Sequence, residues 1–331
     1  MTCGMTGSTR LWAQRLFAQP VFARGTGLGN RLFQWARCRS WCYETGARMI
    51  APAWRRLAIG PLLRRSVPVD QFCGRIALVG QFVDLPEDLH PCWQWWLRMG
   101  CNVSHELLDG QWTLDPAEPL LRLFNGRDDS FSRLNPHQPR LKTDWIRSVA
   151  PLHRQRVDRM AVEPIGINIR LGRDFAPPSP TDGSGYSWIG WLQQTPLSWF
   201  VETLSLIREH AGWCVPAVVV SDGSASQLAA LLHLPNVTWL APSNAVVDLL
   251  TLSRTRLLLG SGSSTFSAWA AFLGQQPVFT APGHPFSRLN LLPLRDQRIG
   301  AFDPRNPDPD DLSAMVTAIQ HSRPSTVMNQ G

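Results

Sequence analysis

The sequence predicts an α/β protein built on parallel sheets. Two observations carry this prediction. Short apolar runs alternate with helical patterns through the second half of the chain, and a glycine-rich turn joins an apolar run to a helical pattern near its start. Hydrophobic residues make up 44% of the 331 residues and charged residues 17%, which is enough apolar material for a packed core. At roughly 150 residues per domain this length predicts two domains, 1–155 and 156–331.

The first half contains few clear elements. Residues 1–19 show none, and Val21 to Ala23 is expected to be a short strand. A glycine-rich turn at 25–30 leads into a helical pattern that Gly46 is expected to end. Strands are expected near 48–52 and 76–83. The densest tryptophan cluster, at 93–96, is expected to lie in the core, as aromatic residues in apolar runs usually do.

The second half alternates regularly between strands and helices. Ile165, Ile167 and Ile169 predict a strand that ends at Arg170, and a long loop rich in Pro, Gly and Ser follows at 171–190. A helix over 195–209 is expected to have Thr195 as its N-cap. Further strands are expected at 216–221, 236–240, 256–259 and 277–280, the last being the final strand. Further helices are expected at 224–232, 244–254, 265–273 and about 311–320.

The net charge suits several classes of anionic binding partner and does not distinguish between them. Lys and Arg number 32 against 25 Asp and Glu, giving +7 and a pI near 9.5. All the basic residues except Lys142 are arginines, whose planar fork binds carboxylate and phosphate. An anionic small molecule, a nucleic acid or an anionic membrane surface would each suit this balance.

The cysteines and the apolar runs exclude other classes. Seven scattered cysteines without a CxxC motif favour packing roles over a disulfide scaffold or a metal site, including the pair Cys38 and Cys42. The sequence contains no run of about 18 uncharged apolar residues, so it predicts no membrane-spanning helix. The start of the chain shows no clean secretory pattern. We therefore expect a protein that works in the cytoplasm.

Ligands of open α/β sheets bind at the carboxyl ends of the strands, and several candidate groups fall at such places. Glycines at 25–29 could bring backbone N–H groups close to a ligand, although an ordinary βα turn would look the same. Arg170 could hold a diphosphate, or it could be a surface arginine paired with Asp174. Hydroxyls at 261–265 and the carboxylate of Asp222 could bind a ligand or merely cap helices.

The order of these motifs resembles one known family. Residues 27–36, GLGNRLFQWA, resemble the GLGNQ(L/M)FQYA opening of the α-1,2-fucosyltransferase family, glycosyltransferase family 11. Residues 167–174, INIRLGRD, resemble its H(V/I)RRGD motif, and 197–200 are similar to the helix start that follows. Residues 220–222, VSD, resemble its FSDD, and 248–273 are similar to its DLxLMS…NSSFSWWxAWL block. The parallels keep the same order from about residue 21 to 280.

The resemblance implies a GT-B fold, in which two Rossmann-like domains with parallel sheets face each other across a cleft. Residues 1–155 would form the acceptor side and 156–331 the nucleotide-sugar donor side. It further implies GDP-fucose as the donor, no metal, and inversion at the sugar carbon. The acceptor would be an oligosaccharide or a lipid-linked glycan, with peripheral membrane contact as one possibility and no nucleic acid.

The family's functional residues carry over to individual positions. The catalytic pair would be Arg170, which corresponds to the arginine that grips the donor's β-phosphate, and Asn30 in the glycine turn. A general base is harder to name, and Asp174 is the nearest candidate. The donor-binding residues implied by the resemblance are Gly29, Asn168, Asp222, Ser264, Thr265 and Phe266.

The chain also departs from the family pattern. Asn168 stands where the family has histidine, Leu171 replaces the second arginine, Gly223 replaces the second aspartate and Ala268 replaces a tryptophan. An extra residue leaves either Arg173 or Asp174 in the place of the motif's acid.

These features favour an inverting GDP-fucose glycosyltransferase acting on a glycan hydroxyl, most simply a galactoside in α-1,2 linkage. The departures motivate an alternative, a catalytically weakened relative that binds a nucleotide sugar or a glycan without transfer. An arginine-rich nucleic-acid binder is a third hypothesis, which would show steep salt dependence.

Overall fold

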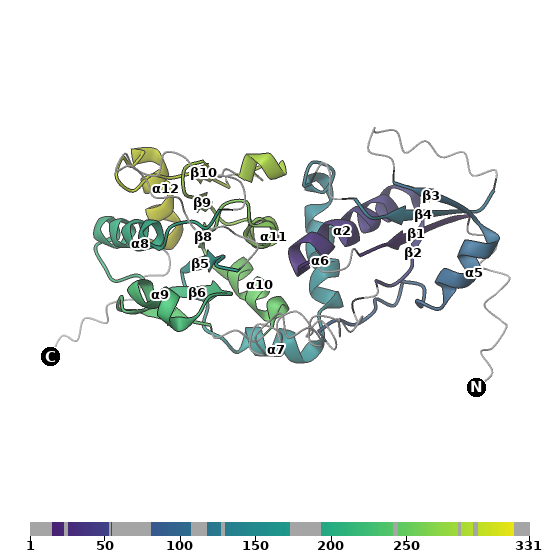
Figure 1. Cartoon of the computed structure of the whole chain (residues 1–331), viewed down its shortest axis with the longest axis horizontal. Coiled ribbons are helices and arrows are strands. Elements are labelled where there is room, and N and C mark those ends of the chain that lie inside the picture. The colour runs from purple at the N-terminus through teal and green to yellow at the C-terminus, as the bar shows by residue number, and fades with distance from the viewer. Residues whose placement is uncertain are drawn as a thin grey trace, which may run out of the picture. The chain divides into compact units, whose positions relative to one another are not determined.

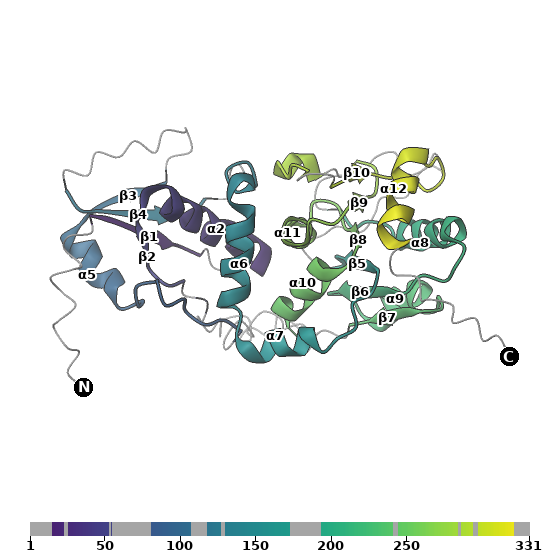
Figure 2. The ribbon, with the colours of Figure 1, turned by 180° about the vertical axis from the view of Figure 1, so that it is seen from behind.

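The computed structural model describes residues 15–22, 26–52, 54, 81–106, 118–126, 130–172, 193–240, 244–283, 286–293 and 297–320. Their contacts divide the chain into two units. The first holds the described residues up to Pro151, and the second holds those from Leu152 onward. Each unit is an α/β structure with a parallel sheet of its own (Figures 1 and 2). The α/β prediction is therefore confirmed.

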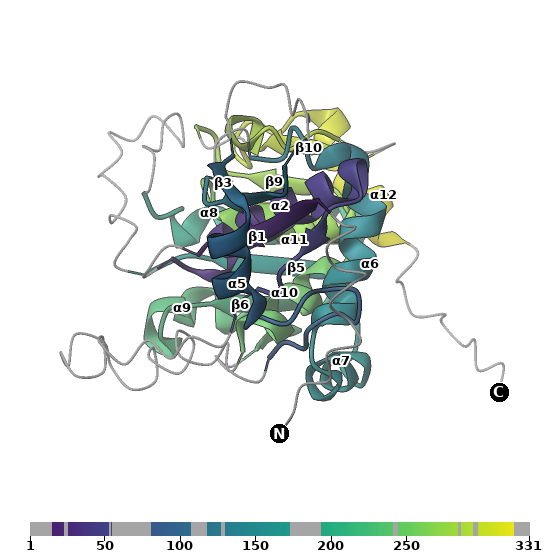
Figure 3. The ribbon, with the colours of Figure 1, turned by 90° about the vertical axis from the view of Figure 1, so that its right-hand side faces the viewer.

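The first unit contains a four-stranded parallel sheet in the order β2-β1-β4-β3. Its strands are β1 (Leu16–Pro20), β2 (Arg48–Met49), β3 (Asn102–His105) and β4 (Leu120–Phe124). Helix α2 (Leu28–Thr45) packs against β1 and β4, and α6 (Gln138–Ser148) packs on α2. The shorter α5 (Trp93–Gly100) precedes β3, and it lies at the surface that Figure 3 shows.

The first strand begins earlier than the sequence suggests. It occupies Leu16–Pro20 between β2 and β4, so the strand expected at Val21–Ala23 is wrong, and Ala23 lies outside the described residues. Gln19 and Pro20 made this strand hard to predict, because a polar residue and a proline both disfavour a central strand. Here Gln19 donates from Nε2 to Gln94 Oε1 at 3.2 Å, and the proline takes the last position, where the ladder ends.

Helix α2 ends as predicted, because Gly46 adopts the left-handed conformation at φ 71°. The strand expected near 48–52 is the two-residue β2, which Ile50 extends by a bridge to Leu89. Most of the strand expected at 76–83 lies outside the described residues. Phe82 forms only an isolated antiparallel bridge with Val149.

Tryptophans fill much of the first core. Trp35, Trp41 and Trp54 are fully buried, and the Trp54 ring stacks on Phe82 with 4.3 Å between centroids. Core packing is what we expected of aromatic residues in apolar runs, but Trp95 and Trp96 on α5 depart from it. Both are exposed, because the helix turns only Leu97 fully into the core.

The second unit contains a six-stranded parallel sheet in the order β10-β9-β8-β5-β6-β7. Its strands are β5 (Ile165–Ile169), β6 (Ala217–Ser221), β7 (Val237–Trp239), β8 (Leu257–Gly260), β9 (Val278–Thr280) and β10 (Ile299–Ala301). Helices α8 (Leu197–Ala211), α9 (Ala225–Leu232) and α12 (Pro309–Gln320) cover one face, while α10 (Ala245–Arg254) and α11 (Thr265–Gly274) cover the other (Figure 1). The short α7 (Pro151–Asp158) packs beside α10.

The strand order reverses at the middle of this sheet. β5 pairs with β6 on one side and with β8 on the other, so the chain fills one half of the sheet before crossing to the other. Such a topological switch point leaves a crevice at the carboxyl ends of the two central strands, which is where open α/β sheets bind ligands.

Most predicted elements of this unit are present within one or two residues of the expected bounds. Two details are wrong. Pro277–Thr280 is not the final strand, because the short, half-exposed β10 follows it with a glycine at its centre. Thr195 does not cap α8, whose N-cap is Pro196; its hydroxyl instead accepts a hydrogen bond from the Gly262 N–H at 3.3 Å.

Candidate functional site

The switch point brings together two loops that the sequence singled out separately. Arg170 directly follows β5, and the run Ser261–Ser264 directly follows β8. The backbone N–H of Arg170 donates to Ser261 Oγ at 2.9 Å, and the Ser261 N–H donates to Asn168 O at 2.9 Å. These bonds fix the backbone of the arginine against the hydroxyl-rich turn.

Asp222 holds both the side chain and the backbone of the loop after β5. Its Oδ2 forms an ion pair with Arg170 Nη1 at 2.7 Å, and its Oδ1 accepts the Leu171 N–H at 2.7 Å. Asp222 follows β6, the strand beside β5. It is not a helix cap, because Ser224 caps α9 through a capping box. The expected alternative partner of Arg170, Asp174, lies outside the described residues.

Asn168 supports the hydroxyl-rich turn from below. Its side chain is buried, with 2% of the residue exposed. Its Oδ1 accepts hydrogen bonds from Ser267 Oγ at 2.6 Å and from Ser264 Oγ at 3.5 Å, and its Nδ2 donates to Val220 O at 3.4 Å. The two bonds from the serines tie Asn168 to the start of α11.

The turn after β8 delivers the start of α11 to the same place. Ser264 is the N-cap of that helix, and its hydroxyl accepts the Ser267 N–H at 3.3 Å. Ser263 adopts the left-handed conformation at φ 57°, which turns the chain sharply into the helix. Within the described part of the chain, the N–H groups of Thr265 and Phe266 have no protein acceptor. Free N–H groups and the helix dipole together favour an anion at this point.

Gly260 lets α11 approach β8 closely. A Cβ at this position would lie 3.1 Å from Ser267 Cβ and 3.2 Å from the Phe286 ring. These contacts are tighter than side chains normally make, so a Cβ here would push Ser267 or Phe286 aside by a few tenths of an ångström.

Sequence reasoning missed one member of this site and did not single out another. Thr195 has the pattern of a helix cap, and only the fold shows its hydroxyl on the glycine–serine turn. Ser261 lies within the quoted run, but nothing in the sequence distinguishes the hydroxyl that receives the Arg170 N–H from its neighbours. The pairing of Arg170 with Asp222, 52 positions further along the chain, had no sequence signal.

The N-terminal candidates lie in the first unit. Gly29 and Asn30 occupy the first turn of α2, which begins beyond the carboxyl end of β1. Gly27 is the N-cap and offers no side-chain acceptor. The Arg31 side chain donates to Thr26 O at 3.1 Å, and burial lowers the pKa of its guanidinium. Gly25, the first residue of the predicted turn, lies outside the described residues.

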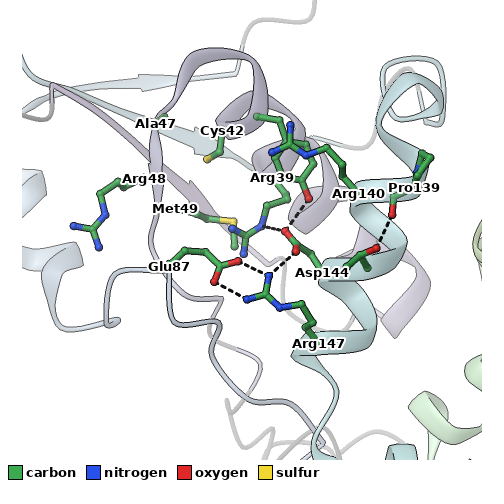
Figure 4. Close-up of a pocket in the computed structure, with 12 residues that line it drawn as sticks. Arg39, Cys42, Ala47, Arg48, Met49, Glu87, Pro139, Arg140, Asp144 and Arg147 are labelled. Atoms are coloured by element: carbon green, nitrogen blue, oxygen red, sulfur yellow. Dashed lines mark hydrogen bonds and ion pairs between the residues drawn. The ribbon is translucent and has the colours of Figure 1, made fainter.

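A separate pocket of about 780 Å³ lies in the first unit, between α2, α6 and the start of β2 (Figure 4). It is at the amino end of β2 and the C-terminal end of α2, whereas Asn30 lies at the opposite end of that helix. Charged side chains dominate its lining, which includes Arg39, Arg48, Glu87, Arg140, Asp144 and Arg147.

Most of these charges neutralise one another. Asp144 accepts hydrogen bonds from the Tyr43 hydroxyl at 2.8 Å and from Arg147 Nη1 at 3.0 Å, while Arg147 also binds both oxygens of Glu87. Arg39 pairs with Asp88. Burial nonetheless raises the pKa of Asp88 to about 6. Burial and the Asp144 carboxylate raise the pKa of Tyr43. The network ties α2 to α6, which gives this pocket a structural role.

Comparison with known proteins supports the fold. No protein-family model and no curated protein matches the chain. The structure of the α-1,6-fucosyltransferase NodZ co-crystallised with GDP matches with a TM-score of 0.51 and 16% identity, covering 82% of this chain and 97% of that one. The structure of fucosyltransferase NodZ from Bradyrhizobium matches with a TM-score of 0.50 and 16% identity, covering 80% and 95%. The chain therefore has the α/β, GT-B-like fold of these structures.

The described residues show neither a metal site nor a membrane-spanning helix. Among them, no three His, Cys, Asp or Glu side chains gather in a way that could hold a metal ion. None of their helices combines the length and the apolar character that crossing a membrane requires.

Proposed function

We propose that the protein transfers fucose from GDP-fucose to a hydroxyl group of a glycan acceptor. The observation that carries the proposal is the placement of Arg170 against the hydroxyl-rich turn at the switch point of the second sheet. The ordered motif resemblance to α-1,2-fucosyltransferases supports it. So does the fold shared with NodZ, an α-1,6-fucosyltransferase that was crystallised with GDP.

The geometry suits a diphosphate leaving group. When the bond between the sugar carbon and the phosphate oxygen breaks, positive charge develops on the sugar and negative charge on the GDP β-phosphate. Arg170 would neutralise that charge through its guanidinium, while the N–H groups of Thr265 and Phe266 donate hydrogen bonds. Donors held in place before the reaction spend no free energy on reorganisation during it. In this proposal the reaction uses no metal.

Asp222 would act as a positioning residue in this scheme. It pairs with the guanidinium at 2.7 Å, which would fix the orientation in which Arg170 meets the diphosphate. The resemblance places it near the nucleoside, where a carboxylate after the second strand of such a sheet commonly meets a ribose. Phe266, half-buried beside the turn, would line the same donor site.

The acceptor and a base complete the proposed reaction. The acceptor oxygen forms the new bond to the sugar carbon with inversion and loses its proton to a base, for which Asp174 is the candidate. Asn30, at the start of α2, would be the second catalytic residue, and Gly29 beside it would bind the donor, as the resemblance implies. The acceptor that the resemblance favours is a galactoside, either free or lipid-linked, which would receive fucose in α-1,2 linkage. We propose that this reaction takes place in the cytoplasm.

One observation favours a second candidate function, a weakened relative that binds the nucleotide sugar without transferring it. Two of the departures from the family pattern are in contact, since a Cβ at Gly223 would lie 2.5 Å from Leu171 Cδ1. An apolar side chain over a glycine therefore occupies the place where the family has an arginine and an aspartate. This replacement removes a guanidinium that could bind a phosphate, together with the carboxylate that could pair with it.

The test is an incubation of purified protein with labelled GDP-fucose and a panel of galactosides. Fucosylated product from a galactoside supports the proposed transfer. GDP-fucose binding without transfer or hydrolysis supports the weakened relative. Absence of GDP and GDP-fucose binding contradicts both, and binding that ignores GDP and weakens steeply with salt indicates a nucleic-acid binder.

A further inference from the structure

Four large apolar side chains are exposed within nine residues of the first unit, on α5 and on the β3 strand that follows it. Trp95 is 68% exposed, Trp96 65%, Met99 75% and Val103 46%. We call these four residues the α5 patch. Large apolar side chains exposed together in this way mark an interaction surface more often than side chains exposed singly.

The patch is held rigidly. Leu97, in the middle of α5, is buried in the small core that includes Phe17, Leu89 and Leu121, and Trp93 packs against the same core. The Cys101 N–H donates to Leu97 O at 3.0 Å and closes the helix where β3 begins. β3 is an outer strand that pairs with β4 alone among the described strands. The exposed indoles are therefore fixed on a packed element.

Acidic residues are absent from the sequence around the patch. None occurs between Asp88 and Glu106, while Arg98 and two histidines do. Glu106 is buried and paired with Arg37, so it does not face outward. The nearest exposed acid with a contact to β3 is Glu118, which accepts a hydrogen bond from Asn102.

The same asymmetry holds for the half of the sequence that contains the patch. Residues 1–151 contain 19 Lys and Arg against 12 Asp and Glu, so their net charge is +7. Residues 152–331 contain 13 of each and are neutral. The entire net charge of the chain therefore belongs to the half that carries the patch. Such a difference between halves points to a polyanionic partner on the charged side.

We propose that the α5 patch docks the first unit on an anionic lipid surface. Indole rings are favoured at the boundary between headgroups and acyl chains, where their apolar body is buried and their N–H stays hydrated. Met99 and Val103 add apolar area, and the basic unit adds attraction to anionic headgroups. The inference does not depend on the proposed function, and it would bring a lipid-linked acceptor to the same surface.

The charges argue against the other occupants of this surface. A second copy of the chain would bring two units of +7 together. A nucleic acid is bound mainly by several basic side chains on its phosphates. The stretch between Asp88 and Glu106 contains one arginine and no lysine.

The test is vesicle co-sedimentation of the full chain. The probes are neutral phosphatidylcholine vesicles and vesicles containing about 30% phosphatidylglycerol, at low and at high salt. The variants are the double substitution W95S/W96S and, as a matched control, Leu152→Ser, which removes a 72% exposed side chain from the second unit. Urea unfolding checks that all three proteins are equally stable.

We expect wild type and Leu152→Ser to bind the anionic vesicles more tightly than neutral ones, and salt to weaken that binding. W95S/W96S should bind at least about ten-fold more weakly, which corresponds to a loss of only about 1.4 kcal/mol of apolar burial. Equal binding by wild type and W95S/W96S overturns the proposal. A wild-type protein that does not sediment with the vesicles also overturns it. Light scattering would then show whether the patch mediates dimerisation, and the nucleic acid retained by the protein would show whether it binds that polymer. Loss of fucose transfer with intact vesicle binding leaves the inference standing.

Discussion

Replacing Arg170 with alanine removes the guanidinium of a residue whose backbone N–H is bonded to the hydroxyl-rich turn. Losing a preorganised donor to a developing negative charge costs about 10²–10³ in rate, or about 2.7–4 kcal/mol of transition-state stabilisation. The fold should tolerate the change. The ion pair with Asp222 is partly exposed, at 27% and 30% for the two side chains, and such pairs contribute about 0–1 kcal/mol to stability. Asp222 would still accept the Leu171 N–H, so the loop after β5 keeps its anchor.

The assay measures kcat/KM for GDP-fucose and the free energy of unfolding in urea for the same preparations. Arg298→Ala is the matched control, because Arg298 forms an ion pair of the same 2.7 Å length with Asp311 at the amino edge of the same sheet. We expect the control to keep its activity and Arg170→Ala to lose at least about a hundred-fold. If Arg170→Ala folds and turns over GDP-fucose as the wild type does, the reasoning about the leaving group is wrong.

Three further predictions concern stability, each measured by urea unfolding. Asn168→Ala should cost about 1–3 kcal/mol, because it leaves the buried Ser267 hydroxyl without its acceptor; a smaller loss would mean that another group replaces the amide. Asp144→Ala should cost about 1–3 kcal/mol, chiefly because it leaves the Tyr43 hydroxyl without its acceptor; an unchanged midpoint would contradict a structural role for that network. Burial raises the pKa of Asp248 to about 7, so the folded state keeps a proton that the unfolded state releases above about pH 4, and stability falls as pH rises from about 4 to 7. Asp248→Asn should therefore be more stable than wild type by about 2 kcal/mol at pH 8 and equally stable at pH 4. The value is smaller than the full pKa shift implies, because the side chain keeps some exposure. A difference in stability that does not change with pH would refute the assignment.

Most helices and strands of the second unit can be predicted from the sequence, because the local sequence signals there agree with one another. Alternating isoleucines at 165–169, the capping serine at 224 and the glycines at 260 and 262 each mark an element boundary that the structure keeps. The first unit lacks such agreement. Its central strand contains Gln19 and Pro20, and β3, with the sequence NVSH, has no apolar alternation. Tertiary packing, which sequence patterns do not record, decides these segments.

The candidate site was predictable in its parts and not in its connections. Residue type and position after a strand were enough to select Arg170, Asp222 and Ser264. The bonds that make them one site cross from one strand end to another, and strand order is not visible in the chain. The exposure of Trp95 and Trp96 was equally hidden, because a short helix can turn either face to the core.

The measurement that tests the donor site most directly is calorimetric titration of the wild type and Arg170→Ala with GDP and with GMP. If the guanidinium and the start of α11 receive the second phosphate, wild type should bind GDP at least about ten-fold more tightly than GMP, and the variant should lose that preference. Equal affinities for the two nucleotides in wild type, or a preference for GDP that survives in the variant, would contradict the assignment.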